Sequence, residues 1–185
     1  MVDPDTGADI PESTRNVLGE VRVRSAYAMH GYVGNPEATA KAYDELGFYK
    51  TGDLVHQADD GHYYFADRIT ELLKYKRYSV FPAEVEMVLL QHPAVLEACV
   101  LGRWCAADGD VPTAFVVRAP TAAGAAVTER DLQALVAERL SDYKQLRGGV
   151  LFLEHMPKTL TGKVARRELK ARLDAFGSSQ PLADN

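Results

Sequence analysis

The sequence predicts a mixed α+β fold, in which a short mixed sheet with flanking helices follows a β-rich N-terminal segment. Apolar and polar residues alternate over Leu18–Arg24, which is typical of a half-buried strand. Later in the chain, Leu132, Val136 and Leu140 recur at helical spacing. The composition, 46% hydrophobic and 25% charged over 185 residues, is that of a globular chain with a core.

Composition and charge exclude several classes of protein. The net charge of −5 gives no reason to expect a nucleic-acid-binding protein. No apolar stretch approaches the ~18 residues that a membrane span needs, and the acidic Met1–Asp5 lacks the apolar core of a secretory signal. Cys99 and Cys105 are too few for a disulfide framework, so we expect reduced thiols in a cytoplasmic protein.

The first 67 residues are rich in strand and turn signals. Pro36–Tyr43 is predicted to be a short helix with proline in its first turn. Phe48–Val55 is strand-like but interrupted by Thr51–Asp53, and Asp59–Gly61 marks a hairpin. Residues 1–67 are too short to bury a core of their own, so we expect them to be the β-rich part of an incomplete domain.

Strands alternate with helices in residues 68–176, a predicted domain of roughly 110 residues. Pro82 begins a helix whose first turn carries acidic residues, where carboxylates are favoured. Thr128 and Asp131 resemble a capping box at the start of another helix. The other expected elements are strands at 72–73, 78–81, 95–101, 113–117 and 150–153, a small-residue linker at 120–126, a basic helix at 166–176 and a frayed tail at 177–185.

The first polar cluster is Tyr49–Asp53. Gly52 permits a tight turn and presents Asp53 just beyond it. The two acceptor oxygens of a carboxylate suit a vicinal diol such as a ribose. Taken alone, Asp53 is more typical of a turn aspartate that closes an Asx-type turn.

The second polar cluster is Asp67–Arg77. Arg68 could donate a fork of hydrogen bonds to a sugar or a phosphate, or it could form a surface pair with Asp67 or Glu71. The basic run Lys74–Arg77 is predicted to be a turn between two short strands. In a chain of negative net charge, this run is more typical of a solvated face than of a nucleic-acid site.

The third polar cluster ends in Thr161–Lys163. A lysine directly after a Thr–Gly turn is a compact, mobile cation that can reach a phosphate or a carboxylate. The cluster is not a Walker-type loop, because the preceding glycine of that pattern is absent. Taken alone, such a lysine is more often an exposed loop lysine than a catalytic one. No metal site is expected, because the histidines and the two cysteines are not spaced as metal ligands usually are. The histidines considered are His56, His62, His92 and His155.

Together and in this order, the clusters resemble the C-terminal part of the adenylate-forming superfamily, which includes acyl- and aryl-CoA ligases, firefly luciferase and adenylation domains of peptide synthetases. The resemblance covers residues 3–173. Gly19–Thr39 resembles the last segment of the large domain, and Tyr49–Asp53 resembles the ribose-binding motif. Asp67–Glu86 resembles the hinge with the start of the small domain, and Pro157–Leu169 resembles the C-terminal lysine motif.

The resemblance implies a reaction in two halves. A carboxylic acid and ATP with Mg give an acyl-adenylate and pyrophosphate, and coenzyme A then displaces AMP to form a thioester. The resemblance implies that Asp53 and Arg68 contact the ribose of the nucleotide. It assigns to Lys163 the bridge between the substrate carboxylate and the α-phosphate. Thr70 takes the hinge position, and Lys74 lies on the face that is presented for the second half-reaction.

Departures from the family pattern fall in the same stretch. The family usually has Asp or Lys at the hinge, where this chain has Thr70. Arg77 replaces a glycine that lets the pantetheine arm pass close to the backbone, which implies an altered thiol tunnel or no thioester formation with coenzyme A. Ser79 stands where similar coenzyme A ligases often carry Gln.

The family's phosphate-binding loop, acyl pocket and catalytic glutamate lie upstream of any segment that this sequence resembles. We therefore expect no catalysis by this chain alone, whether it is a truncated product, an expressed fragment or the complementing half of a split synthetase. The expected partner is a separate large domain or a second copy bound through an exposed face. The alternatives are a non-catalytic interaction module and a nucleotide-binding regulator that uses only Asp53 and Arg68.

Overall fold

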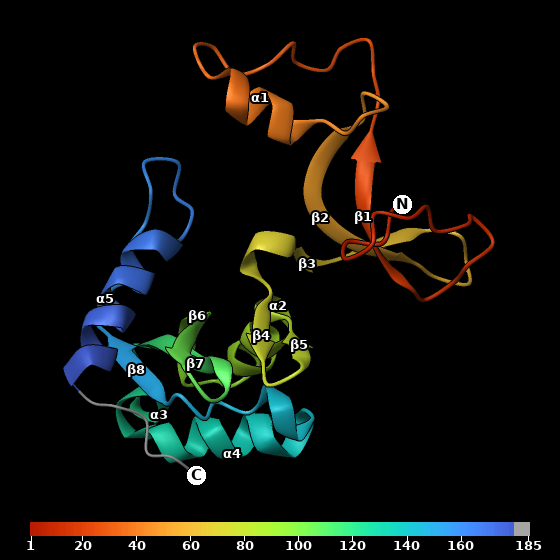
Figure 1. Cartoon of the computed structure of the whole chain (residues 1–185). Helices are drawn as coiled ribbons and strands as arrows, with labels where there is room; N and C mark the ends of the chain where they lie inside the picture. The colour runs from red at the N-terminus through yellow and green to blue at the C-terminus, as the bar shows by residue number, and fades with distance from the viewer. Residues whose placement is uncertain (180–185) are drawn as a thin grey trace. The chain divides into compact units, whose positions relative to one another are not determined.

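The computed structural model describes residues 1–179 and shows two compact units (Figure 1). The first unit is Met1–Thr70, and the second begins at Glu71. Strands and helices occur in both, in the mixed arrangement that the α+β prediction requires. Within the described residues, none of the helices has both the length and the apolar character that crossing a bilayer requires.

The first unit is built on an antiparallel sheet in the order β1-β2-β3. Its elements are β1 (Leu18–Val23), α1 (Pro36–Ala42), β2 (Tyr49–Gln57) and β3 (Tyr63–Arg68). The β1–β2 register shifts after Glu20, so that residues 51–53 bulge from β2 opposite Val21. The expected interruption of this strand is therefore a β-bulge within a continuous strand, and Gly52 adopts the positive φ of +71° that the bulge needs.

The second unit contains a five-stranded mixed sheet in the order β5-β4-β7-β6, with β8 parallel to β7. Its strands are β4 (Leu73–Tyr75), β5 (Tyr78–Val80), β6 (Val95–Cys105), β7 (Gly109–Arg118) and β8 (Val150–Leu153). The predicted strands at 95–101 and 113–117 were too short. Trp104 and Cys105, expected in a loop or as packing residues, pair with Asp110 and Gly109, so β6 and β7 form one long hairpin.

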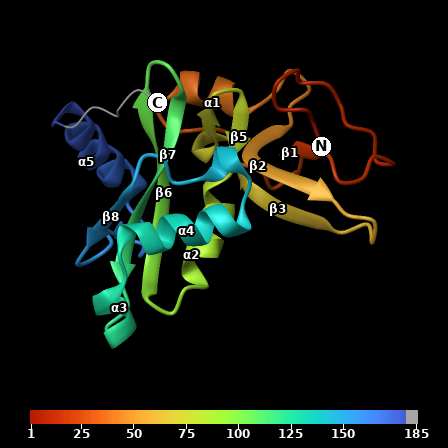
Figure 2. The ribbon, with the colours of Figure 1, turned by 90° about the horizontal axis from the view of Figure 1, so that it is seen from below.

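The helices of the second unit lie on both faces of its sheet (Figure 2). The second unit contains α2 (Pro82–Leu90), α3 (Ala122–Ala126), α4 (Glu129–Arg139), η2 (Asp142–Lys144) and α5 (Arg166–Ser179), and η1 (Ile69–Glu71) crosses the boundary between the units. Val100 and Val116 of the sheet join the core under α2 and α4. Their strand neighbours Cys99 and Phe115 point the other way, into a second core under α5.

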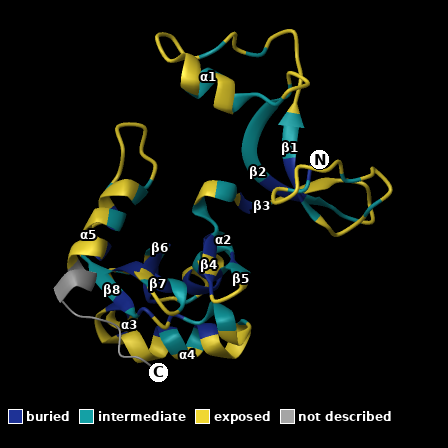
Figure 3. Ribbon diagram, in the orientation of Figure 1, coloured by how far each residue is buried: buried dark blue, intermediate teal, exposed yellow. Residues whose placement is uncertain are grey.

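Burial is concentrated in the second unit (Figure 3). Phe115, Leu89 and Leu132 there have at most 2% of their surface exposed. The prediction that Cys99 is a core residue is confirmed, and burial raises the pKa of its thiol to about 12.

Two predictions about helices were wrong in extent. The expected linker at 120–126 contains α3, because alanines favour a helix and the Thr121 side chain caps it by accepting from the Gly124 amide at 3.1 Å. The C-terminal helix continues to Ser179, past its expected end at Phe176. The rest of the expected tail, 180–185, lies outside the described residues. The capping box of Thr128 and Asp131 is present.

Candidate functional site

Asp53 and Arg68 lie opposite each other on β2 and β3. Nε of Arg68 donates to Oδ1 of Asp53 at 3.0 Å, and the two side chains are 58% and 32% exposed. Each group therefore keeps surface that a sugar or phosphate can reach. Of the two alternative partners, Asp67 accepts from the backbone amide of Arg68 at 2.7 Å, and Glu71 pairs with Arg166.

The β2 bulge holds Asp53 in place through its own polar groups. The Thr51 hydroxyl donates to the Val21 carbonyl at 2.7 Å and accepts from the Asp53 amide at 3.1 Å. The Gly52 amide donates to a carboxylate oxygen of Glu20 at 3.2 Å. The bulge turns this short segment out of the regular ladder while its donors and acceptors stay paired, so Asp53 is fixed by backbone geometry rather than by a packed core.

Ion pairs stabilise Glu20, the acceptor of the Gly52 amide in the bulge. Glu20 is buried, and its carboxylate pairs with Arg22 at 3.0 Å, while Arg22 also reaches Asp44 at 3.2 Å. Burial opposes the charge of Arg22, but the hydrogen bonds that it donates to both carboxylates outweigh burial and raise the pKa of the guanidinium. The backbone amide of Phe48 is the main cause that lowers the pKa of Asp44.

Lys74 lies in β4 rather than in the expected basic turn, which is formed by Lys76 and Arg77. Its ammonium donates to the Ser79 hydroxyl at 3.1 Å across the β4–β5 pair. Its backbone amide donates to Asp110 at 3.1 Å, which fixes the strand to β7. Lys76 has a φ of +54°, and both turn residues are exposed.

Lys163 lies in a hairpin formed by residues 157–165, called the lysine hairpin below. Lys158 and Val164 form an isolated bridge at its base. The Thr159 amide donates to the Lys163 carbonyl at 2.7 Å, and the Gly162 amide donates to the Thr159 carbonyl at 2.9 Å. Gly162 has a φ of +82°, a turn conformation that favours glycine. The Lys163 side chain is exposed, as both interpretations of the sequence require.

The anchor of this hairpin is Arg166, a residue within the Pro157–Leu169 motif to which the sequence alone assigned no role. Its guanidinium pairs with Glu71 and with Glu86, each at 2.9 Å, and donates to the Val100 carbonyl at 3.1 Å. Burial opposes its charge, but Cys99, Glu86 and Glu71 outweigh this effect and raise the pKa of Arg166. The only sequence signal was its place three residues after Lys163, because its partners lie far away in the chain.

Thr70 is exposed and lies in η1, at the last position of the first unit. Its neighbour Glu71, the first residue of the second unit, carries the ion pair to Arg166. The residue assigned to the hinge therefore stands at the boundary between the units, next to a side chain that is tied to the start of α5.

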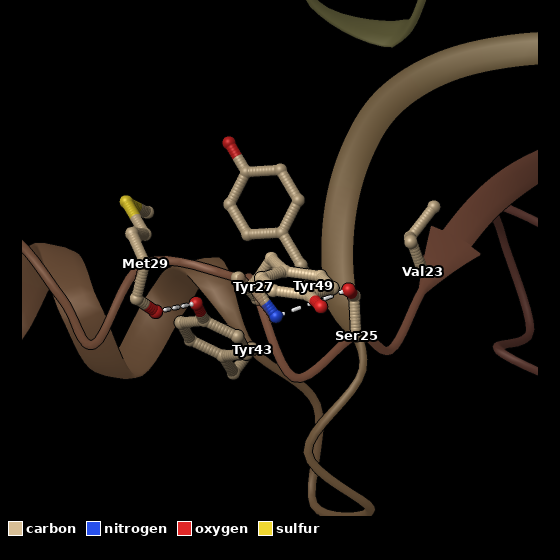
Figure 4. Close-up of a pocket in the computed structure, with 7 residues that line it drawn as sticks. Val23, Ser25, Tyr27, Met29, Tyr43 and Tyr49 are labelled. Carbon is tan, nitrogen blue, oxygen red and sulfur yellow. Dashed lines mark hydrogen bonds between the residues drawn. The ribbon is translucent and has the colours of Figure 1, made fainter.

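A separate pocket of about 370 Å³ lies in the first unit (Figure 4). The rings of Tyr43 and Tyr49 meet edge to face at 5.6 Å, and the Tyr43 hydroxyl donates to the Met29 carbonyl. A hydrogen bond with Tyr32 is the main cause that raises the pKa of Tyr49. The sequence did not reveal this pocket, whose lining combines a loop with two distant tyrosines: Val23, Ser25, Tyr27, Ala28, Met29, Tyr43 and Tyr49.

Residues 84–163 match the family described as AMP-binding enzyme C-terminal domain. The chain is 40% identical over 175 residues to a 4-coumarate–CoA ligase of Vanilla planifolia, a match that covers 95% of this chain and 30% of the relative.

Solved structures agree with these matches. The chain superimposes on ATP-bound MatB from Rhodopseudomonas palustris with a TM-score of 0.84 and 28% identity, covering 95% of this chain and 33% of that one. The amide bond synthetase McbA from Marinactinospora thermotolerans gives 0.79 and 34%, covering 92% and 34%. The chain thus spans about a third of the length of these proteins.

Proposed function

We propose that this chain, which corresponds to the C-terminal part of an adenylate-forming enzyme, serves in the ATP-dependent ligation of a carboxylic acid to coenzyme A. The observation that carries the proposal is the Asp53–Arg68 pair, an exposed carboxylate and guanidinium fixed on a β-bulge. The likeness to 4-coumarate–CoA ligases over 95% of the chain supports the choice of acid and thiol as substrates.

In the first half-reaction, a carboxylate oxygen of the acid attacks the α-phosphorus of ATP. The bond from that phosphorus to the bridging oxygen of pyrophosphate breaks, and an acyl-adenylate forms. Asp53 accepts hydrogen bonds from the ribose hydroxyls while Arg68 donates to the ribose. Lys163 lies between the carboxylate and the α-phosphate, where its ammonium stabilises the charge that grows in the transition state. Magnesium enters with ATP, since Mg²⁺ is commonly held by substrate phosphates.

In the second half-reaction, the thiol sulfur of coenzyme A attacks the carbonyl carbon of the adenylate. The bond from that carbon to the AMP oxygen breaks, the thiol proton is released, and a thioester remains. Lys74 and Lys163 lie on different elements of the second unit, β4 and the lysine hairpin. Rotation of this unit about Thr70 can therefore exchange the two lysines over a nucleotide that stays bound.

A second candidate reaction has an amine in place of the thiol. Arg77 stands exposed in the β4–β5 turn, where the pantetheine arm of coenzyme A would pass. The similarity to an amide bond synthetase supports this candidate. Attack by a small amine forms an amide, releases AMP and needs no path for a long arm.

The proposed partner is a large domain that carries the phosphate loop and the acyl pocket. Apolar side chains are exposed in the first unit, among them Tyr27 and Val33 at essentially full exposure and Phe65 at 60%. We place the activity in the cytoplasm, where ATP and coenzyme A are available and Cys99 and Cys105 stay reduced.

The test is a graft in which this chain replaces the matching C-terminal segment of the Vanilla planifolia 4-coumarate–CoA ligase. We expect pyrophosphate release with 4-coumarate and ATP, followed by a thioester when coenzyme A is added. Lys163→Ala should lower pyrophosphate release by about 10²–10³-fold, the range seen when one charge-stabilising donor is lost.

The matched control is Lys41→Ala, which breaks an exposed Lys41–Glu37 pair in α1 and should leave both steps unchanged. A folded graft that releases no pyrophosphate contradicts the proposed function. Release with coupling to a small amine but not to coenzyme A selects the second candidate.

A further inference from the structure

We propose that Arg166 is a positioning residue, which holds the lysine hairpin to the residue that follows the hinge, so that Lys163 and the hinge move as one body. The inference rests on the proposed function, because it concerns how Lys163 is aimed. Arg166 itself touches neither nucleotide nor acid in this scheme, and it acts through the backbone that leads to Lys163.

Each of the three nitrogens of the Arg166 guanidinium has its own acceptor. Nε pairs with Oε2 of Glu71 at 2.9 Å, Nη2 pairs with Oε1 of Glu86 at 2.9 Å, and Nη1 donates to the Val100 carbonyl at 3.1 Å. Oε1 of Glu86 also accepts from the Val100 amide at 2.8 Å. The planar fork of arginine is thus fixed in three directions, which an ammonium on a flexible stem cannot match.

This junction is sheltered from water. The side chains of Arg166, Glu86 and Glu71 are 25%, 16% and 30% exposed. Charge-assisted hydrogen bonds with this degree of burial are screened less than surface pairs, so they hold their geometry better. Burial lowers the pKa of Arg166, but its acidic neighbours outweigh burial and raise it, so the guanidinium stays charged at neutral pH.

The backbone links Arg166 directly to Lys163. The Arg166 amide donates to the Val164 carbonyl at 3.0 Å, and the Ala165 amide donates to the Pro157 carbonyl at 2.8 Å. The second strand of the lysine hairpin is therefore connected to the first turn of α5 by backbone whose amides are hydrogen-bonded. The first strand of the hairpin is held by Lys158, which pairs with Glu97 at 2.9 Å. This pair is more exposed than the Arg166 pairs and is therefore expected to be weaker.

The other end of the link is the hinge. Glu71 is the last residue of η1 and follows Thr70 directly. A rotation about Thr70 reaches Glu71 first, and its ion pair passes the displacement to Arg166 and the lysine hairpin. Without that pair, the connection from the hinge to the hairpin would run only through the body of the sheet.

The first arm of the test is hydrogen exchange on the full chain, which needs no activity. In Arg166→Met and Arg166→Lys, we expect the hairpin amides of Thr159, Gly162 and Ala165 to exchange about 10-fold faster or more, since their protection depends on this anchor. Amides in the centre of β7 should keep their rates. The matched control is Lys170→Met on the same helix, which loses a bond to the Gly102 carbonyl but no contact with the hairpin or Glu71.

The second arm uses the grafted enzyme. In Arg166→Lys, kcat for pyrophosphate release should fall by about 10²-fold, the scale expected for a catalytic group misplaced by about 1 Å. KM for ATP should stay within about twofold, because Asp53 and Arg68 are untouched. Lys170→Met should change neither constant.

Unchanged hairpin exchange in both Arg166 variants would overturn the inference, as would a rise in KM for ATP at constant kcat. If Arg166→Met does not fold, Glu71→Gln removes only the link to the hinge and leaves Glu86 and Val100 as partners. It should then lower kcat with normal hairpin exchange, and an unchanged kcat would count against the inference. An inactive wild-type graft rejects the proposed function, while the exchange arm still decides whether Arg166 anchors the hairpin.

Discussion

The two units of the chain position their functional side chains by different means. In the first unit, Val2, Leu54 and Val55 are the buried hydrophobic residues, and Asp53 is fixed by the hydrogen bonds of a β-bulge. In the second unit, cores on both faces of a sheet carry the elements that hold the lysines. Backbone hydrogen bonds are enough to position the carboxylate of Asp53. A lysine on a projecting hairpin is positioned only if the elements that carry the hairpin are themselves packed on a core.

The largest difference between the units is expected when one phenylalanine in each is replaced by alanine. Phe115→Ala in the second unit should lower the free energy of unfolding by about 3–5 kcal/mol, because Phe115 is 2% exposed and fills the core under α5. Phe65→Ala in the first unit, with Phe65 60% exposed, should change it by no more than about 0.5 kcal/mol. Urea unfolding and amide exchange measure both changes, and similar costs would break the comparison.

Leucines give a finer comparison. Leu89→Ala should cost about 3–4 kcal/mol, since Leu89 is completely buried between α2 and the sheet. Leu54→Ala should cost about 2 kcal/mol, because the thin sheet around it can close over the missing atoms. Amide exchange in β2 and β7 reports the two values, and a larger loss at Leu54 would contradict a sparse first core.

Helix capping in the second unit has a smaller effect. Thr128→Ala removes the capping box of α4 and should cost about 1 kcal/mol, seen as a lower urea midpoint. Amide exchange in β1 to β3 should not change. Thr121→Ala is the matched control, since its cap serves only the short α3 and should cost less.

The same cap sets a pH dependence. Hydrogen bonds from the Thr128 side chain and backbone lower the pKa of Asp131 below its ordinary value of 3.8. A lowered pKa in the folded state means that the carboxylate stabilises the fold above pH 3.8, and that this contribution is lost as the pH falls through the lowered value. The stability difference between wild type and Thr128→Ala should therefore shrink on acidification, and a constant difference would exclude Asp131 as its source.

A small effect on stability is also expected at the candidate nucleotide site. Asp53→Asn breaks a partly exposed ion pair and should cost at most about 1 kcal/mol. Binding of AMP to the grafted enzyme, measured by calorimetry, should nevertheless fall, because the amide loses one acceptor for the ribose diol. Lys41→Gln breaks an exposed pair in the same unit and should leave AMP binding unchanged.

Local signals predicted much of the fold. The capping box at Thr128, the helix at Pro82 and the β-rich character of the first unit all follow from residues close together in the chain. The length of the β6–β7 hairpin did not, because Trp104 and Cys105 show no strand alternation and are ordered by their partners in β7.

The residues of the candidate site were predictable, but the contacts between them were not. Asp53 and Arg68 were both identified, yet their pairing depends on the register between β2 and β3, which shifts between Leu54 and Val55. Arg166 was missed, since its partners Glu71 and Glu86 are brought to it only by the packing of α2 and α5 around β6.

The place of β6 gives the Arg166 junction a further consequence. Among the described strands, β6 is the last in its sheet, so one side of its backbone has no neighbouring strand. Side chains of Glu86, Arg166 and Lys170 occupy the amide and carbonyl of Val100 and the carbonyl of Gly102. These three side chains take the positions that a strand from another molecule would need, so they also protect the protein from edge-to-edge aggregation.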